Sequence, residues 1–449
     1  MGRLFGTDGA RGIANTELTC ELAMQIGRAA ALVLTKHQSR KPKILIGRDT
    51  RISSSMLEAA LVAGLCSVGA DAELIGVIPT PGVAYLVSRY EADAGIMISA
   101  SHNPVEFNGI KLFSSTGYKL SDDIEQEIEA LILDNPQDIP LKEGTELGRV
   151  YRRRSAPFDY INHIRASIDG DLKGIKVAVD CANGSASSTA DKLFEDLGAE
   201  AIVFHAEPDG TNINKDCGST HIESLTKFVK IHECQLGVAF DGDADRCLAV
   251  DENGNVVDGD QMIAIFADYM KKEGTLAKDT AVVTVMSNLG FFRFAENNDI
   301  HAVATKVGDR YVLEEMLKQG YNIGGEQSGH IIFSDYATTG DGQLSAVKLL
   351  SIIKATGKPL SELADVMEQY PQVMVNVNVS NDKKEFLNTD SDIQKAIQEA
   401  GNTLGKDGRI LVRASGTEPL IRVMAEGKDH RLIQQFADRI AATIQEKLG

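Results

Sequence analysis

Cysteine is scarce in this 449-residue chain, which contains six in all. They show neither a CxxC pair nor the spacing of a zinc site. Scattered cysteines of this kind are typical of reduced thiols in a cytosolic protein. We therefore expect no disulfide framework and a cytoplasmic location.

Long apolar runs and a basic surface are absent as well. The longest apolar stretches, such as residues 29–34, are far too short to cross a bilayer, and no signal-peptide segment is visible. The formal net charge is −18, opposite in sign to the basic face that binds nucleic acid. We expect neither a membrane nor a nucleic acid as partner. The Gly-Lys-Ser/Thr ending of a P-loop is also missing, which disfavours nucleotide-dependent transfer.

What the chain does contain is an internal repeat. Three times, an apolar strand is followed by a helical pattern, a second strand and a third strand that leads into a polar loop. Strands that are apolar on both faces are typical of mixed or parallel sheets covered by helices. The strands are expected at 43–46, 72–77 and 94–98, then at 176–179, 199–204 and 236–240, and finally at 281–285, 300–304 and 321–323.

The pattern changes after residue 370. Val373, Val375, Val377 and Val379 alternate with polar residues, which predicts a half-exposed strand at the start of a smaller domain. The predicted fold class is therefore three related α/β mixed-sheet domains plus a smaller C-terminal α+β domain. We predict the domains at 1–150, 151–252, 253–370 and 371–449.

The first polar loop carries Ser101, at the end of the apolar strand 94–98. A serine in such a turn could simply cap a helix or a turn, or its hydroxyl could attack or carry a phosphoryl group. A hydrolase triad is disfavoured because no G-x-S-x-G surrounds Ser101, and because an extended backbone would direct the neighbouring His102 away from it.

The second polar loop carries Asp241, Asp243 and Asp245, the strongest metal signal in the sequence. Alternating carboxylates supply hard oxygen ligands, which suit magnesium, manganese or calcium better than zinc. An EF-hand is excluded because Arg246 occupies the position of its glycine and because strands, not helices, flank the loop. A merely solvated turn is disfavoured by the mutual repulsion of three carboxylates.

A phosphoryl group on Ser101 would fit these surroundings. Its charge of about −1.5 to −2 could be balanced by a divalent ion on the three aspartates and by Lys111 or Arg11. The sequence therefore favours a phosphoryl carrier over a hydrolytic nucleophile.

Two further loops offer groups for a phosphorylated ligand. Residues 413–417 supply a guanidinium, two hydroxyls and a glycine, a pattern that indicates phosphate binding, although an ordinary hairpin turn stays open. In the third repeat, Glu326 and Ser328 could hydrogen-bond sugar hydroxyls or an amine, and His330 could transfer protons, although a core histidine is the alternative. Residues 305–310 add another polar turn after a strand.

Five motifs together resemble the α-D-phosphohexomutase superfamily over the whole chain. They are residues 5–12, 99–104, 241–246, 325–330 and 413–419. Within that superfamily the sequences of segments 97–101 and 324–330 are most similar to those of the bacterial members that act on glucosamine phosphates. The resemblance implies four domains around one central cleft. One departure is Ala244, where much of the family has glycine.

The resemblance also implies the roles of individual residues. Ser101 would carry the phosphoryl group, and one Mg²⁺ would bind Ser101, Asp241, Asp243 and Asp245. Proton transfer and charge stabilisation would fall to Arg11, Lys111 and His330. The substrate would be bound by Thr305, Gly308, Asp309, Arg310, Glu326, Ser328, Arg413, Ser415, Gly416, Thr417 and Arg422.

The implied reaction interconverts glucosamine 6-phosphate and glucosamine 1-phosphate through a hexosamine or hexose 1,6-bisphosphate. It would feed the synthesis of UDP-N-acetylglucosamine and of the cell wall. A phosphoglucomutase or phosphomannomutase with the same machinery is the alternative, and a non-catalytic sugar-phosphate binding protein is a second one. The expected partner of the protein is a small-molecule sugar phosphate. For the oligomeric state we consider a homodimer.

Overall fold

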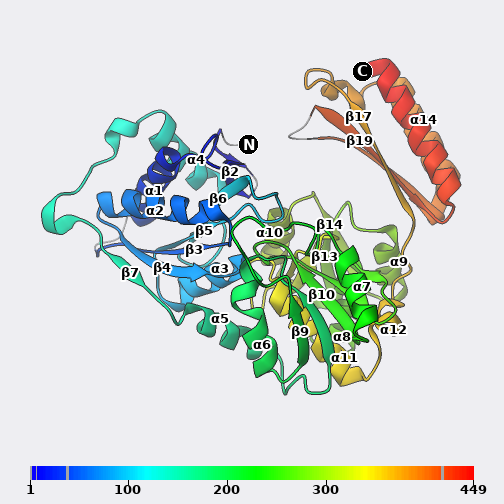
Figure 1. The fold of residues 1–449 in the computed structure, drawn as a ribbon. Coiled ribbons are helices and arrows are strands. Elements are labelled where there is room, and N and C mark those ends of the chain that lie inside the picture. Colours follow the sequence, from blue (N-terminus) through cyan, green and yellow to red (C-terminus); the bar gives the residue numbers. More distant parts are fainter. Residues whose placement is uncertain (1–2, 7, 37–39, 416–418) are drawn as a thin grey trace. The chain divides into compact units, whose positions relative to one another are not determined.

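The computed structural model describes residues 3–6, 8–36, 40–415 and 419–449 (Figure 1). Its first sheet has the strand order β1-β2-β6-β5-β3-β4-β7. The pairs β3/β4, β3/β5 and β4/β7 are parallel, and the others are antiparallel. The strands are β1 (Phe5–Gly6), β2 (Gly9–Ile13), β3 (Lys43–Arg48), β4 (Asp71–Val77), β5 (Ala94–Ile98), β6 (Phe107–Ser114) and β7 (Val150–Arg152).

Helices cover both faces of this sheet, because side chains alternate along its buried strands. Ile44, Ile46 and Ile96 belong to the apolar core shared with α1 (Cys20–Thr35), α2 (Ile52–Ser67) and α4 (Asp122–Leu133). On the opposite face α3 (Thr80–Arg89) approaches β5 so closely that a Cβ on Gly95 would lie 2.4 Å from the Val87 side chain. Glycine at that position permits the contact. The helix α5 (Ala156–Arg165) follows and packs on α3.

The second and third sheets repeat the arrangement of the first. Their strand orders are β12-β11-β10-β8-β9 and β14-β13-β15-β16. In each unit the first strand lies between the second and the third, and an antiparallel strand follows on the far side of the third. The strands are β8 (Lys176–Asp180), β9 (Glu200–Phe204), β10 (Leu236–Phe240), β11 (Cys247–Asp251), β12 (Val256–Val257), β13 (Thr280–Thr284), β14 (His301–Thr305), β15 (Ile323–Gly325) and β16 (Ile331–Phe333).

The predicted threefold repeat of α/β units with mixed sheets is thereby confirmed. The expected strand at 321–323 begins two residues later, because β15 pairs Gly324 with Val282 and extends to Gly325. The remaining helices of these units are α6 (Ala190–Asp196), α7 (Glu223–Ile231), α8 (Gly259–Lys272), α9 (Leu289–Asn297), α10 (Asp309–Gln319), α11 (Gly342–Thr356) and α12 (Leu360–Ala364). Short 3-10 turns lie at Pro136–Asp138, Gly144–Glu146, Ser185–Ser188 and Ala277–Asp279.

The three polar loops occupy the same topological position in their units. Residues 99–106 join β5 to β6, residues 241–246 join β10 to β11, and residues 326–330 join β15 to β16. Each loop thus turns the chain from the third strand of its unit into the antiparallel strand beside it. The repeat therefore explains why chemically different loops recur at equivalent places.

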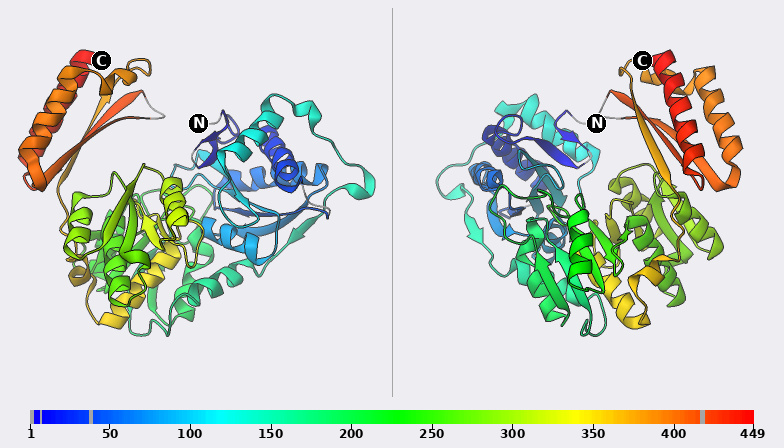
Figure 2. Two further views of the ribbon diagram at one scale, coloured as in Figure 1. Left: turned by 180° about the vertical axis from the view of Figure 1, so that it is seen from behind. Right: turned by 45° about the vertical axis from the view of Figure 1, so that its right-hand side comes forward.

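The C-terminal part forms an antiparallel sheet with the order β17-β19-β18. The alternation predicted from Val373 is confirmed, since Val373 and Val377 of β17 (Gln372–Asn378) are buried with the helices and Met374 is exposed. The helices α13 (Ser391–Leu404) and α14 (His430–Leu448) cover one face of this sheet (Figure 2). Its other strands are β18 (Gly408–Ala414) and β19 (Leu420–Gly427), and 3-10 turns lie at Lys384–Asn388 and Gly405–Asp407.

By its internal contacts the described chain divides into two compact bodies, which differ from the α/β units of the repeat. The larger body comprises residues 1–285 and 303–365, and the smaller body comprises residues 286–302 and 366–449. Within the smaller body, Asn288 connects the segment before α9 to the C-terminal part through two hydrogen bonds with the backbone of Tyr370 (2.9 and 3.0 Å). None of the described helices has the length and apolar character needed to span a bilayer. The four domain boundaries given above remain predictions.

Candidate active site

Ser101 lies in the loop after β5 and is 2% exposed. Its backbone is left-handed (φ 51°), a region that side chains with a Cβ rarely adopt. The Ser101 hydroxyl donates a hydrogen bond to Asp241 Oδ2 (2.6 Å), and its N–H donates to Ser99 Oγ (3.0 Å). The predicted phosphoryl carrier and the first predicted metal ligand are thus in direct contact.

The left-handed backbone changes one expectation about His102. Because residue 101 is not extended, His102 turns back toward the serine, and its Nδ1 lies 3.2 Å from Ser101 Oγ. Burial, together with Arg246 and Arg11, lowers the pKa of His102 to about 4. The ring is therefore neutral near pH 7, beside a hydroxyl that already donates to a carboxylate.

Asp241, Asp243 and Asp245 are buried, and each offers a carboxylate oxygen within 4.8 Å of the others. Their alternate spacing and the left-handed Ala244 (φ 55°) between them bring the three side chains together. Asp243 Oδ1 and Asp245 Oδ1 are buried and have no hydrogen-bond partner among the described residues. A cluster of three carboxylates with oxygens that accept no hydrogen bond is suited to binding a hard divalent cation.

The electrostatics of the three aspartates also favour a bound cation. Burial raises the pKa of Asp241 well above its ordinary value, and repulsion from Asp245 and Asp243 raises it further. A bound cation would relieve this cost. Asp243 is oriented by Thr80, whose hydroxyl donates to Oδ2 (2.6 Å) and whose N–H donates to the Asp243 carbonyl (2.9 Å).

Lys111 of β6 contacts these carboxylates, and Arg11 lies on the neighbouring strand β2. Lys111 Nζ lies 2.8 Å from Asp243 Oδ2, 2.9 Å from Asp8 Oδ2 and 3.5 Å from Asp245 Oδ2. Burial alone would lower the pKa of Lys111, but these three carboxylates raise it well above its ordinary value. Arg11 is less buried and donates to Asn103 Oδ1 (3.2 Å) and Asp8 Oδ2 (3.0 Å). Lys111 thus provides a permanent positive charge.

His330 is buried beside the loop 241–246, the predicted metal loop. Its Nδ1 lies 3.6 Å from Asp245 Oδ2, and its Nε2 lies 3.4 Å from Asp309 Oδ2. The Gly340 N–H donates to Nε2 (3.0 Å), so in the neutral ring the proton is on Nδ1, facing Asp245. Asp309 also receives a hydrogen bond from Lys119 Nζ (2.6 Å). These contacts connect the metal loop to the start of α10.

Glu326 and Gly308 meet at the loop of the third unit. The Gly308 N–H donates to Glu326 Oε1 (3.1 Å), and the Glu326 N–H donates to the His330 carbonyl (3.0 Å). Ser328 Oγ is buried and unpartnered among the residues that the structure describes. A buried hydroxyl without a partner is suited to a ligand that brings its own hydrogen-bonding groups.

Two predicted substrate-binding residues make contacts of a different kind. Thr305 Oγ1 lies within hydrogen-bonding distance of two backbone carbonyls, those of Val283 (3.3 Å) and Lys306 (3.0 Å). Arg310 forms ion pairs with Asp122 and with Glu314 (3.0 Å). Among the contacts of the described residues, none joins Thr305 or Arg310 to the carboxylates near Ser101. The role of these two residues in substrate binding remains a prediction.

In the C-terminal unit, Arg413 of β18 and Arg422 of β19 face each other across the sheet. Burial and the neighbouring Arg422 lower the pKa of Arg413. Like charges placed opposite each other destabilise a sheet, so such a pair favours an anion between or above them. Ser415 is buried at the end of β18, and its carbonyl accepts a hydrogen bond from Lys384 Nζ (2.8 Å). Gly416 and Thr417 lie outside the described residues.

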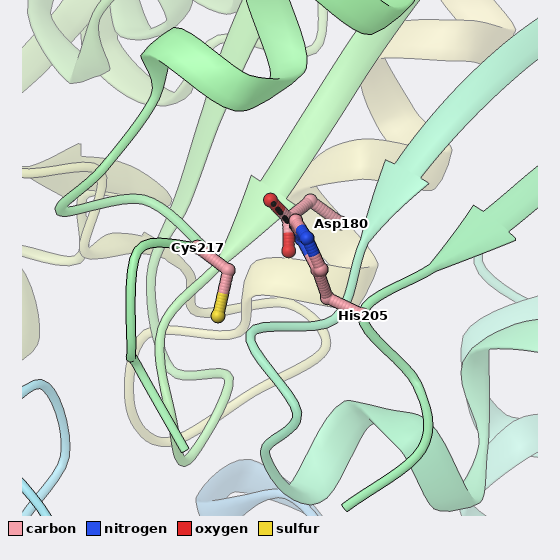
Figure 3. Close-up of side chains that lie close together, drawn as sticks. All are labelled: Asp180, His205 and Cys217. Atoms are coloured by element: carbon pink, nitrogen blue, oxygen red, sulfur yellow. Dashed lines mark ion pairs between the residues drawn. The ribbon is translucent and has the colours of Figure 1, made fainter. Parts of the chain in front are cut away.

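A second cluster with metal-ligand chemistry lies in the second unit, formed by Asp180, His205 and Cys217 (Figure 3). Here the carboxylate is already engaged. Asp180 accepts hydrogen bonds from the N–H groups of Ala182 (2.9 Å) and Gly218 (3.0 Å), and His205 Nδ1 lies 3.1 Å from its Oδ2. Unlike the Asp241 loop, this cluster ties loop backbones together.

Several residues around the site escaped sequence reasoning. Lys119 and Thr80 contact predicted site residues but stand alone in their segments, with no pattern to mark them. Asp8, which contacts Lys111, lies within the motif 5–12, but that motif did not indicate a role for it. Arg246 was visible as the end of the Asp241 motif. Its N–H donates to Asp241 Oδ1 (3.2 Å).

Four domain families match the chain in succession. Their descriptions are phosphoglucomutase/phosphomannomutase alpha/beta/alpha domain I at residues 2–138, domain II at 158–254 and domain III at 258–370, and the C-terminal domain at 374–443. Together they span most of the chain.

Individual proteins agree with the domain matches. The chain is 57% identical to the phosphoglucosamine mutase of Acetivibrio thermocellus over 449 residues, and 56% identical to that of Clostridium acetobutylicum over 447, with all of each protein covered. Among solved structures, a phosphoglucomutase/phosphomannomutase family protein of Burkholderia thailandensis has a TM-score of 0.84 at 24% identity, covering 99% of this chain and 98% of its own. The Aspergillus fumigatus N-acetylphosphoglucosamine mutase, solved with GlcNAc-6P and magnesium, has a TM-score of 0.67 at 17% identity, with 99% and 95% covered.

Proposed function

Since the chain belongs to the phosphoglucomutase/phosphomannomutase family, a family of phosphohexomutases, we propose that it interconverts glucosamine 6-phosphate and glucosamine 1-phosphate. The observation that carries the proposal is the contact of Ser101 Oγ with Asp241 Oδ2, at a cluster of three buried carboxylates. The glucosamine substrate is supported by full-length identity to phosphoglucosamine mutases. We place the reaction before the synthesis of UDP-N-acetylglucosamine and of the cell wall.

In the proposed reaction, Ser101 carries a phosphoryl group. In the first transfer the bond between Ser101 Oγ and phosphorus breaks while the sugar O1 forms a new bond to that phosphorus; the proton of the O1 hydroxyl passes to a protein base, and Ser101 Oγ takes up a proton. The resulting 1,6-bisphosphate reorients in the site. In the second transfer the bond between the sugar O6 and its phosphorus breaks while Ser101 Oγ bonds to that phosphorus; the serine hydroxyl gives up its proton and O6 takes one up, which leaves glucosamine 1-phosphate and a phosphorylated Ser101.

The carboxylates of Asp241, Asp243 and Asp245, with Ser101, are the residues that would hold Mg²⁺. When bound, the ion would neutralise negative charge in the transfer. Lys111 is held 2.8 Å from Asp243 and keeps a positive charge next to the phosphoryl group. His330 lies beside Asp245, and Arg11 donates to Asp8, which also contacts Lys111; we assign these two residues to proton transfer and charge stabilisation.

The remaining predicted residues would bind the sugar phosphate. We propose that Glu326 and Ser328 hold the sugar, with Gly308 and Asp309 beside them, and that the phosphate not being transferred binds the C-terminal loop. The positions of Arg413 and Arg422, directly opposite each other on β18 and β19, support the second assignment. Thr305, Arg310, Gly416 and Thr417 complete the proposed binding set. A homodimer remains a prediction.

A coupled assay tests the function. Purified protein is incubated with glucosamine 6-phosphate, Mg²⁺ and a trace of glucose 1,6-bisphosphate, and glucosamine 1-phosphate is measured. We expect turnover, and we expect Ser101→Ala to lower kcat by at least about 10³-fold. The matched control is Ser115→Ala, an exposed serine directly after β6, which should leave kcat unchanged. An alanine variant at 101 with full activity would sink the mechanism. Faster turnover of glucose 1-phosphate would instead favour a phosphoglucomutase.

A further inference from the structure

The backbone carbonyl of Ser101 accepts hydrogen bonds from two side chains. Arg51 Nη2 donates to it at 2.9 Å, and Asn214 Nδ2 donates to it at 2.8 Å. The same two donors also reach the carbonyl of Asn103, at 2.8 Å from Arg51 and 3.2 Å from Asn214. Two carbonyls of the loop that carries Ser101 are therefore fixed by the same pair of side chains.

Arg51 belongs to the first unit and is almost entirely buried. Its Nε donates to Asp49 Oδ2 (2.8 Å), and Asp49 in turn accepts a hydrogen bond from the Ser99 hydroxyl (2.7 Å). Its Nη1 donates to the carbonyls of Pro104 and Phe107. Because the planar guanidinium of Arg51 donates most of its hydrogen bonds to one loop, it fixes the conformation of that loop.

Asn214 comes from the second unit, in the long segment between β9 and α7. It is 6% exposed and has a left-handed backbone (φ 57°). Its N–H donates to the Ala182 carbonyl (2.9 Å). Gly242, inside the metal loop, lies directly beneath the contact, since a Cβ there would meet the Ser101 carbonyl at 2.5 Å and Asn214 Nδ2 at 2.8 Å. Asn214 thus binds the serine loop where the metal loop passes under it.

The Asp180 cluster of Figure 3 anchors the segment that delivers Asn214. Asp180 holds His205 at the beginning of the segment and Gly218 at its end. Asn183 adds a hydrogen bond from its N–H to the His205 carbonyl (2.6 Å). With both ends fixed to the same strand end, the Asn214 side chain is held against the serine loop.

We propose that Asn214, acting with Arg51, is a positioning residue that keeps the Ser101 hydroxyl directed at the Asp241 carboxylate by holding the Ser101 carbonyl. The left-handed backbone of Ser101 is the reason that such a grip is needed, since this conformation is disfavoured for serine and must be imposed by its surroundings. Loss of the grip would let the hydroxyl move relative to the three carboxylates. A displacement of about 1 Å at a reacting atom can cost about 10²-fold in rate.

Two variants of Asn214 test the proposal, which rests on the proposed function for its kinetic part. Asn214→Gly removes both N–H donors and tolerates the left-handed backbone. Asn214→Asp keeps the shape but places an acceptor against the two carbonyls. We expect both to lower kcat for glucosamine 6-phosphate by about 30-fold or more, with KM within about twofold of wild type. The matched control is Lys215→Ala, the exposed neighbour in the same segment, which should not change kcat.

Hydrogen exchange of the segment 99–107, followed by mass spectrometry, supplies a readout that does not depend on turnover. We expect faster exchange in this segment in both Asn214 variants, with unchanged exchange in β8 and β10. Wild-type kcat in both variants, or unchanged exchange in 99–107, would overturn the proposal. A general loss of protection across the second unit would also overturn it, because Asn214 would then support only the fold. If the wild-type protein had no mutase activity, the proposed function would fail while the exchange result would still decide the positioning role.

Discussion

Lys119 Nζ lies 2.6 Å from Asp309 Oδ2, which joins the first unit to the beginning of α10. The same ammonium lies 2.7 Å from Asp8 Oδ1. Burial alone would lower the pKa of Lys119, but Asp309 and Asp8 raise it. With Lys111 and His330, these groups form a continuous series of contacts that reaches Asp243 through Lys111 and Asp245 through His330.

Replacing Lys119 by methionine is expected to destabilise the protein by about 3 kcal/mol, because Asp8 and Asp309 lose a buried partner. The measurement is urea unfolding followed by circular dichroism. Lys119→Met combined with Asp309→Asn should lose less stability than the sum of the two single variants, since the pair is coupled. Additive losses would contradict the contact.

Removal of the metal is expected to lower the melting temperature. Mg²⁺ at about 100 times its Kd should stabilise the protein by about 2.7 kcal/mol, which corresponds to a rise of several degrees. Asp245→Asn, compared with its own metal-free melting temperature, should show a much smaller rise. Potassium chloride at equal ionic strength serves as the control. An equal response of the variant to Mg²⁺ would place the ion elsewhere.

Glu125 in α4 provides a pH-dependent prediction. Burial, reinforced by Asp122 and Glu129 and opposed by Arg310, raises the pKa of Glu125 to about 7. Its ordinary value is about 4.5. A raised carboxyl pKa contributes stability that is complete below the unfolded value and is lost as the pH rises through 7.

Glu125→Gln cannot ionise and should therefore stabilise the protein at pH 8 by about 1 kcal/mol, a value reduced for partial exposure. The difference from wild type should shrink toward pH 4. Thermal unfolding at both pH values checks this, with the exposed Glu143→Gln as control. A stabilisation of equal size at both pH values would refute the assignment.

The thiol of Cys217 should resist modification in the folded protein. Cys217 is buried, and burial with the nearby Asp180 raises its pKa to about 12. Only the half-buried Cys20 and Cys66 should react with Ellman's reagent at pH 8 before unfolding, whereas all six cysteines should react in denaturant. Mass mapping of labelled peptides identifies the sites. Rapid labelling of Cys217 would show that the Asp180 cluster opens.

The features predicted well from sequence are those encoded by neighbouring residues. The strand pattern of the three units is local, because apolar runs such as 94–98 and 236–240 are buried on both faces. The Asp241 loop is likewise recognisable because its three ligands lie within five residues. The domain fold and the carboxylate cluster therefore follow from the sequence.

Contacts between distant segments were not predictable in this way. Asn214 and Thr80 are single polar residues in unremarkable loops, and only folding brings them to Ser101 and Asp243. The conformation of Ser101 was also missed, because serine has no intrinsic preference for φ near +50°. Arg310 pairs with Asp122 and Glu314, contacts that the sequence of the loop 305–310 does not indicate, and its role in binding remains a prediction.

The recurrence of one loop position in three sheets has a consequence for how such a chain can diversify. Each loop joins two neighbouring antiparallel strands, so its residues can be exchanged while the ladders on either side stay in register. The serine, the carboxylates and the loop 326–330 belong to separate copies of the unit. A new sugar preference could therefore arise by substitution of Glu326 or Ser328 in one copy, while Ser101 and the three carboxylates in the other two copies stay unchanged.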